Sequence, residues 1–335
     1  MQPNRVRRLF SSGYMPVFMH SDYTVQLPDT HTFPMHRYEA VWRAMEQHCG
    51  KKDSMIRIME SRLATKQEVL SVHDENYVTN FSRGRLNEKQ MRKIGFPFSY
   101  DFVRRTFRIT GGSLSCVEHV LDPERPGDRV AGNLAGGTHH AFTAHGEGFC
   151  IFNDIACCTY LALHGGTVPK NVNRVVSLDF DVHQGNGTAE MLRNEPGAFT
   201  LSVHGSKNYP WDDEPSDLDF GVEDDVSEEE YLQVCSEALE KTSALLAEEG
   251  PFPCDPYGNQ NSEMPELVIF QAGVDPLKSD RLGRLKMSRE TLQDRNEMVY
   301  RWCKERGSRV VCLMGGGYSY PNIEDSVACH VDVFS

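Results

Sequence analysis

The stretch 175–191, VVSLDFDVHQGNGTAEM, constrains the fold more than any other part of this chain. It begins at 175–178 with an apolar, β-branched run that is typical of a strand buried in a parallel sheet. Gly185 and Gly187 then predict a turn, and a helical pattern follows from Thr188. The order strand, turn, helix predicts an open α/β sheet, in which ligands bind beyond the carboxyl ends of the strands.

Three polar side chains follow that apolar run: Asp179, Asp181 and His183, each two residues apart. In an extended chain, residues two apart point to the same side, so the three side chains are expected to face one way. Two carboxylates and an imidazole suit a divalent metal such as zinc. The plainer alternative is that an aspartate caps the next helix and that His183 is only solvated.

Predicted strands and helices alternate along the chain, which indicates an α/β protein with a mainly parallel sheet wrapped by helices. Neither an internal repeat nor a clear linker is evident, so residues 1–335 are predicted to form a single domain with its core at about 16–333. Residues 251–265 are rich in Pro, Asn and Gly and are expected to be a surface insertion. Further strands are predicted at 16–23, 70–73, 199–203, 266–272 and 309–314, and helices at 35–48, 153–163, 288–306 and 322–333.

Composition argues against several classes of protein. No apolar run approaches the roughly 20 residues of a membrane span, so no membrane partner is expected. The net charge of −13 disfavours direct binding to nucleic acid and is compatible with cationic substrates. The ten cysteines include no Cys-x-x-Cys pair, which favours an intracellular, reducing compartment: the cytoplasm, the nucleus, or a plastid or mitochondrion after removal of a transit peptide. A homo-oligomer is left open.

Asp275 follows another predicted strand, after Gly273, which permits a tight bend. Together with Asp181 and His183 it gives two carboxylates and one imidazole. Such a set leaves coordination positions open for water and substrate, which is the mark of a catalytic rather than a structural metal site.

Adjacent histidines, His139 and His140, lie in the glycine-rich stretch 130–154. Because imidazole titrates near neutrality, the pair could act as bases near a metal, although a chance His-His pair is the common alternative. Tyr318 follows three glycines, and its phenol could donate to a developing oxyanion. A plain turn with a surface tyrosine is the alternative, and the absence of a following Lys-Ser/Thr argues against a phosphate-binding loop.

Five motifs occur together in the order and approximate spacing of one known family, and the chain resembles the histone deacetylase family over about residues 16–333. The motifs are Gly136-Gly137-Thr138-His139-His140, Gly148-Phe149-Cys150, Asp179-x-Asp181-x-His183, Asp275-Pro276-Leu277 with Asp280-Arg281-Leu282-Gly283, and Gly315-Gly316-Gly317-Tyr318. The segments 183–187 and 280–283 are most similar to its class IV-like and bacterial-like branch.

The resemblance implies an arginase/deacetylase fold with about eight strands, one catalytic Zn²⁺ and a structural monovalent cation, usually K⁺. The implied zinc ligands are Asp181, His183 and Asp275. The implied potassium ligands are the backbone carbonyls of Asp179, Asp181, His183 and Val203 and the hydroxyl of Ser202. Phe149 and Tyr209 would flank a narrow tunnel for the acylated amine chain, and the Gly148 carbonyl would accept the substrate amide N–H.

The implied reaction is amide hydrolysis by a metal-activated water. His140 would take the proton of the water, and Tyr318 would stabilise the oxyanion. Asp179 would orient His139. Position 186 departs from the family, because Asn186 stands where many relatives have aspartate as the partner of the second histidine. A neutral partner supports an imidazolium less, so His140 is expected to be less basic than in such relatives.

The sequence therefore predicts a zinc-dependent deacetylase that acts on acyl-lysine side chains in proteins or on small N-acetylated amines. One alternative is a non-catalytic protein that binds acyl-lysine or a partner on the same fold, although no catalytic group is missing. Another is a two-manganese ureohydrolase, which needs further carboxylate ligands in place of the histidine pair and the tyrosine. Acidic residues within 212–219 could attract cationic substrates or form a solvated loop.

Overall fold

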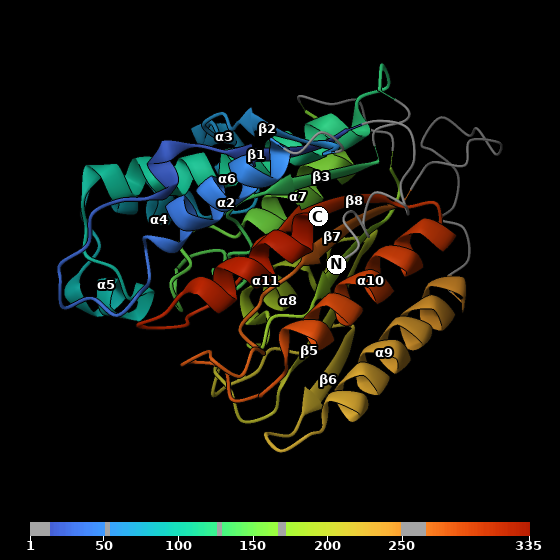
Figure 1. Cartoon of the computed structure of the whole chain (residues 1–335). Coiled ribbons are helices and arrows are strands. Elements are labelled where there is room, and N and C mark those ends of the chain that lie inside the picture. Colours follow the sequence, from blue (N-terminus) through green and yellow to red (C-terminus); the bar gives the residue numbers. More distant parts are fainter. Residues whose placement is uncertain (1–13, 51–53, 126–128, 167–171, 249–265) are drawn as a thin grey trace, which may run out of the picture.

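An all-parallel sheet lies at the centre of the molecule (Figure 1). The computed structural model describes residues 14–50, 54–125, 129–166, 172–248 and 266–335. Within these residues, eight strands pair in the order β2-β1-β3-β8-β7-β4-β5-β6, which confirms the predicted parallel sheet. The strands are β1 (Met15–Met19), β2 (Ile56–Glu60), β3 (Val130–Asn133), β4 (Val175–Asp179), β5 (Ala198–Gly205), β6 (Leu218–Val222), β7 (Leu267–Gln271) and β8 (Arg309–Leu313).

Helices cover both faces of this sheet (Figure 1). On one face, α2, α11, α10 and α9 form a row in which each helix packs against the next, and α6, α7 and α8 form a row on the other face. No helix in the described parts of the chain combines the length and apolar content needed to cross a bilayer. The helices are η1 (Ser21–Tyr23), α2 (Arg37–Cys49), α3 (Lys66–Leu70), α4 (Glu75–Ser82), α5 (Glu88–Ile94), α6 (Tyr100–Leu121), α7 (Asp154–His164), α8 (Asn186–Leu192), α9 (Glu228–Glu248), α10 (Arg289–Glu305) and α11 (Glu324–Phe334).

Short polar signals in the sequence begin two of the predicted helices. Asn153 Oδ1 accepts a hydrogen bond from Ala156 N at 2.9 Å at the start of α7. Ser288 Oγ accepts one from Thr291 N at 3.2 Å at the start of α10. Each cap satisfies a backbone donor that has no partner within the helix, so both predicted starts are confirmed.

The predicted strand end at 70–73 is wrong. Thr65 and Glu68 form a capping box, which begins a short helix, so these residues follow α3. The sequence also does not reveal β2 and β6, because both are edge strands with solvent-exposed residues that obscure the apolar pattern. A third unpredicted strand, β3, is only four residues long and opens the glycine-rich stretch. The predicted insertion at 251–265 lies outside the described residues.

Arg295 on α10 is fully buried and links the ends of two central strands. Its Nη1 donates to the carbonyl oxygens of Phe180 at 3.0 Å and Gly273 at 2.8 Å, just beyond β4 and β7. Its Nη2 donates to Asn296 Oδ1 at 2.8 Å. The guanidinium thereby satisfies buried backbone carbonyls at the two strand ends that lead into the candidate metal ligands.

Arg295→Ala is expected to destabilise the protein by about 3 kcal/mol, because two buried carbonyls lose their donor and a cavity replaces the side chain. Arg301→Ala on the same helix removes only a solvent-exposed ion pair with Glu297, and should change the free energy of unfolding by less than about 0.5 kcal/mol. Chemical denaturation measures both values. If Arg295→Ala changed the free energy of unfolding as little as Arg301→Ala, the structural role of Arg295 would be contradicted.

Candidate active site

Four neighbouring strands, β3, β8, β7 and β4, end at the same edge of the sheet. This edge is where open parallel sheets bind ligands. The loops that leave these strands bring together 136–140, 181–183, 275–283 and 315–318, which are far apart in the sequence. The candidate residues singled out in the sequence therefore meet because their strands are neighbours.

Asp181, His183 and Asp275 form a buried cluster at this edge. His183 Nδ1 lies 3.0 Å from Asp181 Oδ1 and 3.0 Å from Asp275 Oδ2. One ligand atom from each residue lies within 4.8 Å of the other two. Two carboxylate oxygens and an imidazole nitrogen fit a divalent ion such as zinc, and three protein ligands leave a coordination position open.

Backbone groups hold both carboxylates in place. Gly316 N donates to Asp181 Oδ2 at 2.8 Å, and Val182 N donates to Asp275 Oδ1 at 2.9 Å. Glycine at 316 also allows close approach of its loop, because a Cβ atom there would lie 2.1 Å from Asp275 Oδ2. The packing of the carboxylate cluster therefore requires glycine at position 316.

The charges of the cluster favour a cation. Burial raises the pKa of Asp275 to about 7, and the neighbouring Asp181 carboxylate contributes to this shift. Burial also acts to raise the pKa of Asp181, but His139 and His183 hold it well below its usual value. Two carboxylates buried so close together disfavour joint ionisation unless positive charge compensates them, so the donor set suits a metal ion.

The histidine pair lies beside this cluster, and the ring centroids of His139 and His140 are 4.1 Å apart. His139 Nδ1 lies 2.6 Å from Asp179 Oδ2, while His140 Nδ1 lies 2.8 Å from Asn186 Oδ1. Burial acts to lower the pKa of His139, but neighbouring carboxylates, Asp179 first, raise it to about 9. Burial and two neighbouring imidazoles lower the pKa of His140 well below its usual value. The pair is thus divided into one charged and one neutral imidazole.

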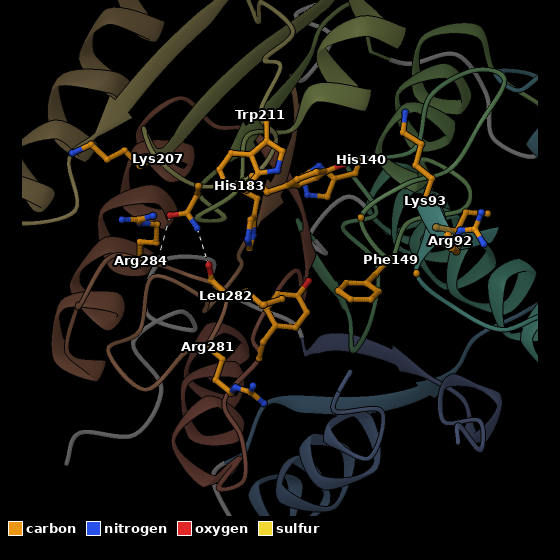
Figure 2. A pocket seen from close by; sticks show the side chains of 16 residues that line it. Arg92, Lys93, His140, Phe149, His183, Lys207, Trp211, Arg281, Leu282 and Arg284 are labelled. Carbon is orange, nitrogen blue, oxygen red and sulfur yellow. Dashed lines mark hydrogen bonds between the residues drawn. The ribbon is translucent and has the colours of Figure 1, made fainter. Parts of the chain in front are cut away.

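A pocket of about 710 Å³ opens onto His140 and His183. Figure 2 shows both imidazoles and Phe149 around this cavity, and Gly148 and Tyr209 complete the predicted lining. The φ angles of Gly148 (55°) and Phe149 (66°) are both in the left-handed region. A Cβ atom at 148 would lie 2.6 Å from His140 Cδ2, so glycine is required where the wall meets the imidazole.

Tyr318 lines the same pocket, with its ring centroid 6.1 Å from that of His183 and 6.1 Å from that of Phe149. Its backbone N–H donates to Asp280 Oδ2 at 2.5 Å. Asp280 also accepts hydrogen bonds from Leu282 N and Gly283 N through its other carboxylate oxygen. This carboxylate thereby ties the loop after β7 to the loop that carries the tyrosine.

The mouth of the pocket carries basic rather than acidic side chains. Figure 2 shows five of them around the opening: Arg92, Lys93, Lys207, Arg281 and Arg284. None of the acidic residues at 212–219 lines the pocket. Instead, Asp217 accepts hydrogen bonds from Thr200 N and Oγ1, and Glu214 pairs with Arg193. These acidic residues therefore do not form the wall of the pocket.

Glu147 is a buried carboxylate beside the pocket that the sequence analysis does not single out. It accepts hydrogen bonds from Tyr209 Oη at 2.5 Å and from Asn186 Nδ2 at 3.0 Å. The sequence feature that could have indicated this residue is its position: Glu147 is a lone acidic residue between Gly146 and Gly148, just before Phe149.

Comparison with known proteins decides the family. A family model described as the histone deacetylase domain matches residues 31–334. The chain belongs to the histone deacetylase family. It is 35% identical to an uncharacterized protein from Picosynechococcus sp., over 94% of this chain and 95% of that protein. It is 30% identical to Histone deacetylase 2 of Arabidopsis thaliana, over 78% of this chain and 63% of that relative.

Solved structures share the fold of this histone deacetylase-family chain. A homologue of histone deacetylases from Aquifex aeolicus has a TM-score of 0.70 at 22% identity, covering 96% of this chain and 83% of that one. The HD domain of HDA15 has a TM-score of 0.68 at 18% identity, covering 95% and 89%. The predicted arginase/deacetylase fold is confirmed, while the class IV-like branch stays a prediction.

The residues predicted to bind potassium lie on or just beyond two paired strands of this fold. Asp179 at the end of β4 pairs in register with Ser202 of β5. Ser202 Oγ lies 3.0 Å from His204 Nδ1. Val203 follows on the same strand, and the other two predicted ligands are the metal-cluster residues that follow β4. This cation site stays a prediction.

Asn186→Asp is expected to move the acid limb of the pH–rate profile to higher pH. A carboxylate beside Nδ1 favours the imidazolium, so the pKa of His140 should rise. A general base acts only while unprotonated, and activity would then be lost earlier as the solution is acidified. Steady-state rates across the acidic and neutral range measure this shift. An acid limb that stays in place would count against the pairing of His140 with residue 186.

Proposed function

We propose that this protein is a zinc-dependent amidohydrolase that removes acetyl or other acyl groups from amines. Membership of the histone deacetylase family supports a deacetylase hydrolase activity. The observation that carries the proposal is the convergence of the metal-ligand cluster, the histidine pair and a phenol. His183 of the cluster lines the same pocket as His140 and Tyr318.

Zinc held by Asp181, His183 and Asp275 would supply Lewis-acid chemistry, polarising an acyl carbonyl and lowering the pKa of a water. His140 has a lowered pKa and is neutral near neutral pH, so its Nε2 would accept a proton while Nδ1 faces Asn186. A protonated imidazole of the histidine pair would then return a proton to the leaving amine.

The phenol of Tyr318 would donate a hydrogen bond to the oxyanion that develops on the acyl oxygen. Burial raises the pKa of this phenol well above its usual value, which keeps it protonated and able to donate. Phe149 and Tyr209 would flank the acylated chain, and the Gly148 carbonyl would accept the substrate amide N–H. Aromatic walls with a few polar groups suit an extended alkyl chain that must be held in one register.

The substrates proposed are acyl-lysine side chains of proteins or small N-acetylated amines. The basic rim of the pocket gives no support to steering of cationic substrates by the acidic loop. A panel of acetyl- and long-acyl-lysine peptides, acetylpolyamines and N-acetyl arylalkylamines would identify the class. Each substrate should be tested with metal-stripped and zinc-restored protein, and activity that is independent of zinc would overturn the proposal.

No feature favours the alternatives on the same fold. The metal-ligand cluster, the histidine pair and the tyrosine are all retained, whereas a non-catalytic binder has no need of them. Among the described residues one metal-ligand cluster is found, which gives no support to a two-manganese ureohydrolase. The proposal includes a potassium ion near Asp179 and Ser202, and a reducing intracellular compartment. The nine free cysteines among the described residues are compatible with that compartment.

Tyr318→Phe is expected to lower kcat on the order of 10²- to 10³-fold with little change in KM, because the phenol acts in the transition state. Tyr320→Phe is the matched control, since Tyr320 is exposed and does not line the pocket. Initial rates with an acetyl-lysine peptide measure both variants. A Tyr318→Phe variant with full activity would remove the tyrosine from the mechanism.

Asp275→Asn is expected to abolish stoichiometric zinc binding, because it replaces one of two anionic ligands with a neutral amide of the same shape. Elemental analysis of dialysed protein measures the zinc content. Asp212→Asn, at an exposed position, should retain the zinc of the wild type. Retention of one zinc per chain by Asp275→Asn would show that the ion binds elsewhere.

A further inference from the structure

Glu147 connects the wall of the pocket to the partner of the catalytic imidazole. Its side chain is only 6% exposed. Oε1 accepts hydrogen bonds from Tyr209 Oη at 2.5 Å and from Asn186 Nδ2 at 3.0 Å. Oε2 faces the ammonium group of Lys93 and lies 3.3 Å from His145 Nε2. Both oxygens of this buried carboxylate are therefore engaged, and Oε1 joins Tyr209, which lines the pocket, to Asn186, the partner of His140.

Glu147 remains ionised in this setting. Burial acts to raise its pKa, but hydrogen bonds from His145, Lys93, Tyr209 and Asn186 together hold the pKa well below its usual value. An ionised carboxylate has no hydrogen to donate, so it can only accept from its partners. Asn186 must therefore turn its amide nitrogen, and not its oxygen, toward Glu147.

This requirement fixes the direction of the Asn186 amide, whose oxygen and nitrogen ends have nearly the same shape. With the nitrogen toward Glu147, Oδ1 lies 2.8 Å from His140 Nδ1 and accepts from Gly187 N at 3.0 Å. Because that oxygen can only accept, the hydrogen of the neutral imidazole must be on Nδ1. The available lone pair of the His140 imidazole is then on Nε2, which is the nitrogen that can take a proton.

We propose that Glu147 is a positioning residue that orients Asn186, holds His140 in the Nδ1–H tautomer and fixes Tyr209 in the pocket wall. The kinetic part of this inference rests on the proposed deacetylase function. The arrangement also accounts for the neutral amide at position 186. The negative charge is that of Glu147, which reaches His140 only through Asn186, whereas an aspartate at position 186 would contact the imidazole directly. The more distant charge still selects the Nδ1–H tautomer, but it stabilises the imidazolium less.

A purely structural role is the alternative, in which Glu147 only anchors α5 through Lys93. The Lys93 side chain is 53% exposed, and ion pairs of such exposed groups contribute little to stability. The hydrogen bonds from Asn186 and Tyr209 involve the other carboxylate oxygen. The test therefore needs measurements that respond to the state of the imidazole and not only to stability.

Long-range ¹H–¹⁵N spectra of protein labelled with ¹⁵N-histidine report the tautomer of each imidazole, whether or not the substrate is known. His140 is assigned by the signals that disappear in His140→Ala. In the zinc-loaded wild type we expect the hydrogen of His140 on Nδ1. In Glu147→Leu, which removes the acceptor, we expect averaged signals of two tautomers. A folded Glu147→Leu variant with an unchanged His140 spectrum overturns the proposal.

The kinetic consequence is measured on the same variant. Glu147→Leu should lower kcat by roughly 10- to 100-fold, by analogy with the loss of side chains that orient metal-binding histidines. Glu297→Gln is the matched control, because its carboxylate forms an ion pair on α10 and does not line the pocket. It should keep the kcat of the wild type. A wild-type kcat in Glu147→Leu overturns the proposal.

Transposing the charge separates positioning from general damage to the fold. In the wild type, Asn186 Nδ2 donates to Glu147 Oε1 at 3.0 Å. Asn186→Asp alone replaces this donor with a second carboxylate, and the two carboxylates repel each other. The side chain at position 186 is then no longer held toward His140, so kcat should fall. Adding Glu147→Gln supplies an amide donor to the new carboxylate, and the double variant should recover roughly 10-fold in kcat over Asn186→Asp. A double variant no faster than Asn186→Asp overturns the proposal. If the wild type cleaves no acylated amine, the proposed function fails, and the tautomer spectra still decide the role of Glu147.

Discussion

Two buried carboxylates converge on a single imidazole nitrogen, and the centre of the fold is arranged around that convergence. Asp181 and Asp275 both approach Nδ1 of His183 within hydrogen-bonding distance. Like charges so close in a buried place are unfavourable without compensation, so the surroundings must supply donors. Backbone N–H groups of Val182 and Gly316 donate to the two carboxylates, and Arg295 links the backbone at the ends of the two strands that lead into them.

The same edge of the sheet gives two neighbouring histidines different properties. His139 faces the carboxylate of Asp179 and favours its charged form, whereas His140 faces the amide of Asn186 and favours its neutral form. Both imidazoles are buried, so the difference comes from their neighbours: the carboxylates of Asp179 and Asp181 raise the pKa of His139, whereas the imidazoles of His139 and His183 lower that of His140. A site with one charged and one neutral imidazole can both accept and donate a proton without rearrangement.

Much of this fold and site could be predicted from the sequence, for identifiable physical reasons. The apolar run at 175–178 predicts a buried strand because a central parallel strand is covered on both faces. The edge strands β2 and β6 lack that pattern, since one side of each is exposed, and they become strands through pairing with a neighbour. The strand end predicted at 70–73 fails because the capping box at Thr65 starts a helix just before it.

The sequence by itself determined which chemical groups the site contains and that they follow strand ends, because strand, turn and spacing are local properties of the chain. It also predicted the ligand set Asp181, His183 and Asp275, through motifs whose order is kept along the chain. Only the tertiary structure decided that β4, β7 and β8 are neighbours, that the pocket mouth is basic, and that Glu147 reaches Asn186. Those contacts join residues far apart in sequence, and side-chain direction across such distances is set by packing and not by local pattern.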